Sequence, residues 1–104
     1  MALQTVNNSP SQVVLDYLNP IFLNMKNTMI AQIFDSSSNP VFAQKDITLK
    51  LVSNNKDVLT LPENITITKG QYYIPLDIIP KAIGTSQVSI LADDMPLSTY
   101  KITV

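Results

Sequence analysis

The sequence predicts an all-β domain, a sandwich of about seven antiparallel strands with immunoglobulin-like topology. Apolar and polar residues alternate with a period of two from about residue 13 to the end of the chain. Clusters of Asn, Pro, Gly and Ser interrupt this alternation at the spacing of about 8–12 residues that is typical of sandwiches. A chain of 104 residues that is 45% hydrophobic holds one core and leaves no room for a second domain.

The first strand is expected at Val13–Tyr17. An alternative is a helix over Pro10–Met25, because several apolar residues in this range are also spaced helically. Asn19-Pro20 would break such a helix in its middle. A strand that leads into a loop is therefore favoured.

The next two strands are expected at 29–34 and 47–51. In the first, Met29, Ala31 and Ile33 share the core face, and Ile30, Gln32 and Phe34 share an outer face that is unusually apolar. In the second, Ile47, Leu49 and Leu51 alternate with Thr48 and Lys50. This clean alternation is typical of a strand with one buried and one solvated face.

The middle of the chain predicts two short strands, 59–61 and 65–68, that a bend at Pro62-Glu63-Asn64 separates. A longer strand follows at 72–78, with Tyr72, Ile74, Leu76 and Ile78 on one face. Pro75 has no N–H to donate, so it requires an edge strand, a bulge or a direction that faces solvent. The last hairpin joins 88–92 to 100–104 through the turn Asp93-Asp94-Met95-Pro96.

The domain is expected over residues 12–104, with residues 1–11 as a flexible leader or linker. The chain ends inside its last predicted strand, as a module taken from a string of domains would. The first ten residues have neither a basic start nor an apolar core, so an export signal is expected elsewhere in a longer protein. Pro75, Asp77, Pro80 and Lys81 interrupt the richest apolar stretch, 72–83, which is too short for a membrane helix.

The residues that are missing exclude most catalytic chemistry. The chain contains no His, Cys, Arg or Trp, so it has no Ser-His or Cys-His pair, no histidine or thiolate metal ligand and no disulfide. Its seven Lys form no run and the net charge is -1, which disfavours nucleic acid as a partner. We expect a module that is not an enzyme and that holds no cofactor.

Two polar features are candidate sites. Asp93 and Asp94 form an acidic pair, and their oxygens near Asp46 or Asp57 would suit Ca²⁺, although ordinary turn chemistry is the favoured interpretation. Asn64-Ile65-Thr66 matches the N-glycosylation pattern, as does Asn7-Asn8-Ser9. Such matches also arise by chance in a chain rich in Asn and Thr.

The aromatic residues suggest a binding surface. Tyr73 and Phe34 are the best candidates for exposed rings on which a sugar stacks, whereas most other aromatics are expected in the core or against a neighbouring domain. Ile30 and Phe34, both on the outer face, are candidates for a protein interface. Glycans and neighbouring domains are therefore the expected partners.

Several segments in order resemble the bacterial Ig-like domains of invasin, intimin and related cell-surface proteins, whose relatives also occur in archaeal surface proteins. The second strand of that family and its turn resemble Ala31–Asp35 and the residues that follow through Val41. Its middle strands are similar to residues 53–62 and 65–70. The start of its sixth strand is similar to Gly84-Thr85, which precede Val88. The resemblance covers about residues 11–104.

Two features depart from the family pattern: Ser37 or Ser38 stands where that family usually has Gly, and Tyr72-Tyr73-Ile74-Pro75 replaces a strand of small residues. Fibronectin type III or another sandwich family stays open. The resemblance implies a non-catalytic structural or interaction module of an extracellular surface, adhesin or S-layer protein. The alternative is a carbohydrate-binding or accessory module attached to an extracellular enzyme.

Overall fold

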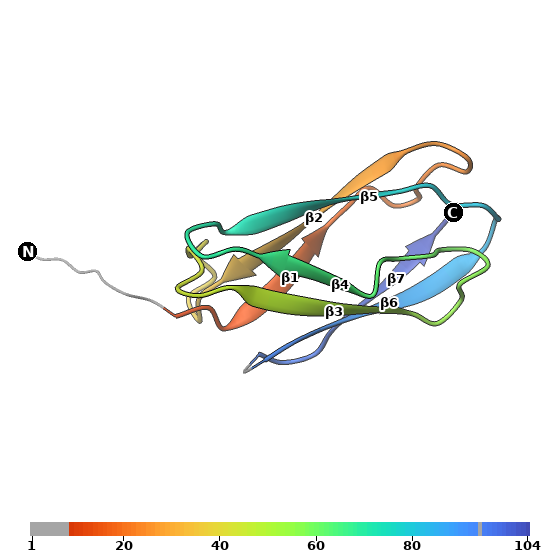
Figure 1. Cartoon of the computed structure of the whole chain (residues 1–104). Helices are drawn as coiled ribbons and strands as arrows, with labels where there is room; N and C mark the ends of the chain where they lie inside the picture. Colours follow the sequence, from red (N-terminus) through yellow and green to blue (C-terminus); the bar gives the residue numbers. More distant parts are fainter. Residues whose placement is uncertain (1–8, 94) are drawn as a thin grey trace, which may run out of the picture.

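The computed structural model describes residues 9–93 and 95–104. In this part of the chain, seven β-strands form two antiparallel sheets that face each other (Figure 1). The three-stranded sheet contains β1 (Gln12–Asp16), β2 (Asn27–Phe34) and β5 (Tyr73–Ile78). The four-stranded sheet contains β3 (Ile47–Ser53), β4 (Asn64–Ile67), β6 (Thr85–Ala92) and β7 (Ser98–Thr103). The predicted all-β, immunoglobulin-like sandwich is confirmed.

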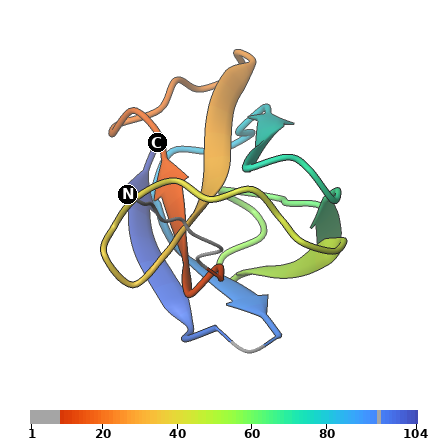
Figure 2. The same ribbon diagram turned by 90° about the vertical axis from the view of Figure 1, so that its left-hand side faces the viewer.

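The position of β4 determines which of the two sheets has four strands. In constant-type immunoglobulin domains the fourth strand lies beside the fifth. Here β4 lies beside β3, with Ile47 opposite Ile67 and Lys50 opposite Asn64, so the sheet orders are β1-β2-β5 and β4-β3-β6-β7. Figure 2 looks along the molecule from one end and shows β1 beside β7, where the two sheets approach each other.

The core lies between the sheets, where the alternation of the strands predicted it. Along β3 every second residue is buried, and in β2 the buried residues are Met29, Ala31 and Ile33. The largest side chains with no more than 1% exposure come from both sheets and from the loop after β3: Met29, Ile33, Leu49, Leu59, Ile67, Ile90 and Ile102. The hydrophobic effect therefore holds both sheets to one shared interior.

The β3–β4 connection corrects one prediction. No strand forms at 59–61; instead the amides of Val58 and Leu59 both donate to the carbonyl of Asn55, at 3.2 and 3.0 Å. The Thr60 hydroxyl donates to the carbonyl of Lys56 at 2.8 Å. Val58 and Leu59 are buried all the same. Their apolar side chains enter the core from a local turn, because that turn already satisfies the backbone groups.

Pro75 lies on an edge strand, as its missing N–H requires. β5 pairs only with β2, and Pro75 lies opposite Ile30. The Ile33 amide donates to the carbonyl of Tyr72 at 3.0 Å, which places Ile30 and Pro75 in a pair without ladder hydrogen bonds. The nitrogen of Pro75 therefore faces the outer side of β5.

The segment between β1 and β2 is a loop, not the second half of a helix. It includes a cis peptide bond between Asn19 and Pro20. The Asn27 side chain holds the loop together, since it accepts from the Phe22 amide at 3.0 Å and donates to the carbonyls of Phe22 and Met25 at 2.9 and 2.8 Å. Across the described residues, no helix is both long and apolar enough to cross a bilayer.

Candidate binding surfaces

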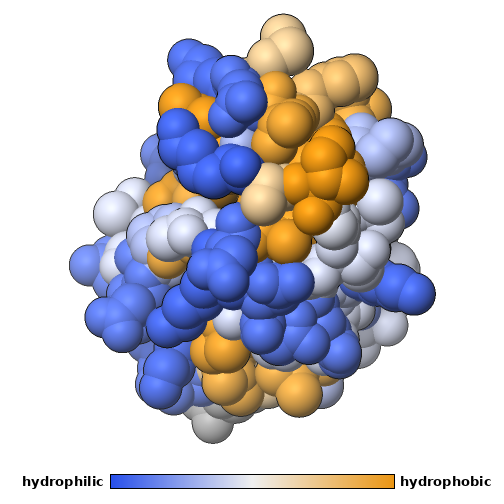
Figure 3. All heavy atoms as spheres, turned by 90° about the vertical axis from the view of Figure 1, so that its right-hand side faces the viewer, coloured by the Kyte–Doolittle hydropathy of each residue, from blue (hydrophilic) through white to orange (hydrophobic). Residues whose placement is uncertain are grey.

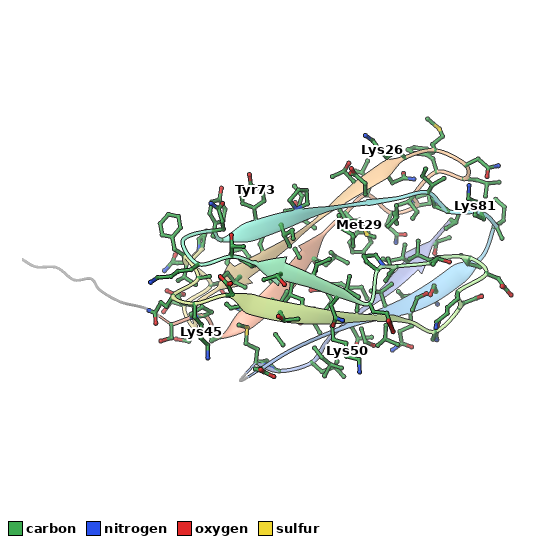
Figure 4. All side chains as sticks on the ribbon, in the orientation of Figure 1. Lys26, Met29, Lys45, Lys50, Tyr73 and Lys81 are labelled. Atoms are coloured by element: carbon green, nitrogen blue, oxygen red, sulfur yellow. The ribbon has the colours of Figure 1, made fainter. Side chains whose placement is uncertain are left out.

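The outer face of the three-stranded sheet carries the predicted interaction residues. Ile30 and Phe34 of β2 and Tyr73 of β5 all point away from the core. Figure 4 shows the difference in direction, with Tyr73 on the outer side of β5 and Met29 between the sheets. Tyr73 is 40% exposed, whereas Ile30 and Phe34 are only half-buried. Tyr73 is therefore the more exposed of the two predicted stacking rings.

Tyr72 corrects a second prediction. It was expected on the core face with Ile74 and Leu76, but it is 38% exposed. Tyr72 lies just before β5 begins, and its ring meets the edge of Phe42 with the ring centroids 5.9 Å apart and the planes at 82°. It also lies 4.9 Å from Tyr73, between ring centroids. Tyr72 therefore packs against Phe42, outside the core, and does not face inward.

Phe42 was not identified from the sequence as a surface residue. It is 67% exposed, between the buried residues Val41 and Ala43. The apolar run Val41-Phe42-Ala43 alternates between buried and exposed residues, as a strand does, although it belongs to a loop. This alternation is the signal that would have predicted the exposure of Phe42. Phe42, Tyr72 and Tyr73 together form an aromatic row, the name used below for these three residues.

A shallow hollow of about 270 Å³ opens beside the aromatic row, and its lining consists of Ile30, Gln32, Tyr72 and Tyr73. Gln32 lies directly opposite Tyr73 in the β2–β5 register. Two of the predicted interaction residues, Ile30 and Tyr73, thus meet at one site. Phe34 does not line it.

A second surface was missed by the sequence analysis. Many of the exposed apolar side chains belong to only two loops, β1–β2 and β5–β6, which lie at one end of the sandwich. We call this surface the apolar end; its exposed residues are Leu18 (71%), Phe22 (54%), Met25 (59%), Ile79 (50%) and Ile83 (70%). Figure 3 looks onto this end and shows apolar side chains gathered on it.

The apolar end is held in shape by backbone hydrogen bonds. The Asn24 amide donates to the carbonyl of Pro80 at 2.9 Å, which joins the two loops. The Ile21 amide donates to the carbonyl of Thr103 at 2.9 Å, and the Val104 amide donates to the carbonyl of Gly84 at 2.8 Å. Residues 103 and 104 therefore also belong to this end. Lys26 and Lys81 lie beside it (Figure 4). Loop residues have no regular period, which is why alternation did not reveal this surface.

The acidic residues considered as candidates for Ca²⁺ come together only in part within the described chain. Asp94 lies outside the described residues. Asp93 and Asp46 line the same hollow, of about 590 Å³, but Asp57 follows β3 at the other end of the sandwich. One oxygen of Asp46 already accepts from the Lys69 amide at 2.9 Å. No group of three or more acidic, His or Cys side chains suited to a metal occurs among the described residues.

Asn64, the predicted glycosylation acceptor, is exposed at the start of β4. Its acceptance of a glycan stays a prediction. The other matching site, at Asn7, lies outside the described residues, as does most of the predicted leader 1–11. Ser11, at the end of that leader, donates its amide to the carbonyl of Phe34 at 2.8 Å.

The fold is similar to that of two solved structures. One is the solution NMR structure of a CARDB domain from Pyrococcus furiosus, with a TM-score of 0.63, 12% identity, and coverage of 94% of this chain and 97% of that domain. The other is a β-glucuronidase from Parabacteroides merdae, with a TM-score of 0.66, 12% identity, and coverage of 96% of this chain but 13% of the enzyme.

No protein-family model and no curated protein sequence matches the chain significantly. At 12% identity both likenesses concern the fold alone. They agree with an immunoglobulin-like β-sandwich module and leave the predicted invasin and intimin type without support.

Proposed function

We propose that this chain is a non-catalytic module of a larger extracellular or cell-surface protein, and that its apolar end packs against a neighbouring domain of the same polypeptide. The observation that carries the proposal is the gathering of exposed apolar side chains on two adjacent loops. Contiguous apolar surface of this kind marks an interface, because its exposure to water is unfavourable.

The energetic argument is direct. Burying one large aliphatic or aromatic side chain contributes about 1.5–3 kcal/mol. The five residues of the apolar end are each at least 50% exposed in this chain, so half or more of that contribution is still to be gained. Asn27 and the bond between Asn24 and Pro80 hold the loops in place, so docking requires little reordering.

Support for a role inside a longer chain comes from the comparison with the β-glucuronidase, in which a sandwich of this shape makes up 13% of one polypeptide. The same comparison favours the second candidate, an accessory module attached to an extracellular enzyme. Both candidates share the docking of the apolar end, and they differ in what lies next to it.

Hydrogen exchange tests the docking. Backbone amides of residues 17–26 and 79–83 should exchange more slowly in the native polypeptide that contains this chain than in the chain alone. The pair Phe22→Ser and Ile83→Ser should abolish this protection. Leu91→Ser is the matched control, because Leu91 is 44% exposed on β6, away from both loops. Equal exchange in the chain and in the native polypeptide would contradict the proposal.

Fractionation tests the location. An antibody raised against the chain should detect the native polypeptide in the cell envelope or the culture medium of the source cells. Detection in the cytosol alone would exclude the extracellular role. The sequence of that polypeptide then separates the two candidates: a catalytic domain beside this one identifies an accessory module, and tandem copies identify a structural array.

A further inference from the structure

The hollow beside the aromatic row has the composition of a small-ligand site. Such sites combine aromatic and aliphatic walls with a few polar groups that orient the ligand. Here Ile30, Tyr72 and Tyr73 supply the walls and Gln32 supplies the polar group. The volume of about 270 Å³ lies just below the range of about 300–1,000 Å³ of pockets for drug-sized ligands, so it suits a single ring.

The rings are held in place by one another. Tyr72 lies between Phe42 and Tyr73, with centroid distances of 5.9 and 4.9 Å. Edge-to-face and tilted contacts of this kind between aromatic rings are favourable. The two tyrosines are nevertheless 38% and 40% exposed. A ligand would therefore meet rings that pack against one another and are still open to solvent.

The polar groups of the hollow are available. The Gln32 amide offers two donors and one acceptor, and none of them has a partner among the described residues. The hydroxyls of Tyr72 and Tyr73 are likewise without a partner in the described part of the chain. By contrast, the Tyr100 hydroxyl accepts from Leu15 in a structural contact. The hollow thus presents hydrogen-bonding groups that suit a hydroxylated ligand.

The charges on the face that carries the hollow favour a neutral ligand. Its four lining residues are uncharged. On the same sheet face, the strand register places Asp16 opposite Ile30 and Asp77 opposite Thr28, whose hydroxyl donates to Asp77 at 2.7 Å. These two carboxylates lie on the face that carries the hollow and disfavour a phosphate or a uronic acid there.

We propose that this hollow binds one pyranose unit of a neutral glycan. The apolar C–H face of the sugar lies against Tyr72 and Tyr73, and Gln32 hydrogen-bonds its hydroxyls. A neutral ring is not repelled by the carboxylates of Asp16 and Asp77. The proposal concerns the outer face of the three-stranded sheet and does not depend on docking at the apolar end, so either proposal can fail alone.

The test begins with the whole chain on an array of neutral and acidic oligosaccharides, followed by titration of the ¹⁵N-labelled chain with each glycan that binds. Neutral glycans should shift the backbone amides around Gln32 and Tyr73. Tyr73→Ala and Gln32→Leu should each weaken binding about tenfold or more. Tyr73→Phe should weaken binding less than Tyr73→Ala, because it keeps the ring face and removes only the hydroxyl.

Phe22→Ala is the matched control, since Phe22 is an exposed aromatic residue on the apolar end and should leave glycan affinity within about twofold. Far-UV circular dichroism confirms that each variant is folded. The proposal is overturned if no neutral glycan binds, if acidic and neutral glycans bind equally, or if Tyr73→Ala leaves affinity unchanged in a folded protein. Shifts confined to the other sheet would overturn it as well.

Discussion

The backbone amide of Leu15 donates a hydrogen bond to the hydroxyl of Tyr100 at 2.9 Å, although the two residues lie 85 positions apart. Leu15 belongs to the edge strand β1 of the three-stranded sheet, and Tyr100 to β7 of the other sheet. The Ser98 hydroxyl donates to the carbonyl of Val13 at 2.8 Å in the same way. Side chains of β7 thus occupy the outer edge of β1, which would otherwise be open to another strand.

Tyr100→Phe should destabilise the fold by about 1–3 kcal/mol, because it leaves the amide of a buried residue without its acceptor. Denaturant unfolding followed by far-UV circular dichroism measures the change in the free energy of unfolding. Tyr73→Phe is the control: its exposed hydroxyl has no partner among the described residues, so stability should not change. Equal effects of the two substitutions would contradict the role of Tyr100.

Gly84→Ala should be the more harmful of the two possible glycine-to-alanine changes. Gly84 has φ +150°, and a Cβ there would lie 2.8 Å from Cγ2 of Val58. Gly70 has φ +89°, but a Cβ added there would meet no other atom within 4 Å. Gly70→Ala should therefore lower the free energy of unfolding only by the cost of backbone strain, about 1–2 kcal/mol. Gly84→Ala adds overpacking of about 1–3 kcal/mol. Thermal unfolding of the two variants measures the difference.

A double-mutant cycle isolates the contact between Gly84 and Val58. In a Val58→Ala background, Gly84→Ala should be less destabilising by about 0.5–3 kcal/mol, because the clashing methyl is gone. An unchanged effect of Gly84→Ala would show that backbone strain explains it without the contact.

Ser86→Ala should destabilise the four-stranded sheet. Ser86 is fully buried, its hydroxyl lies 2.6 Å from that of Ser53, and it accepts from the Asn55 amide at 3.2 Å. Removing it leaves buried groups without a partner, which costs about 1–3 kcal/mol. Adding Ser53→Ala should cost little more, since both hydroxyls of the pair are then gone. Additive losses in chemical denaturation would argue against a coupled pair.

Pro75→Thr should promote self-association while changing stability by less than about 0.5 kcal/mol. The substitution restores an N–H on the outer side of β5, an edge that Pro75 now blunts. Sedimentation velocity over a range of concentrations should show a larger share of dimers or larger species than the original chain shows. Asp77→Thr, on the same face of β5, is the matched control. A strictly monomeric Pro75→Thr would show that Pro75 does not protect this edge.

The candidate sites were predictable only in part. Tyr73 and Ile30 were correctly placed on an outer face, because strand alternation determines facing. Alternation also placed Tyr72 inward, which is wrong, since the residue lies before β5 where the core ends. The apolar end was missed because its loops lack a period. The strand expected at 59–61 failed because a local turn satisfied its backbone groups.

The sequence by itself determined the fold class, the approximate positions of all seven strands that the structure describes and the core residues that lie in those strands, since each depends on local alternation between apolar and polar side chains. Tertiary structure alone decided that β4 pairs with β3, that Phe42 reaches Tyr72, and that the loops carrying Phe22 and Ile83 form one surface. These contacts join residues far apart in the chain. Their partners are selected by how the two sheets pack, and no local pattern encodes that packing.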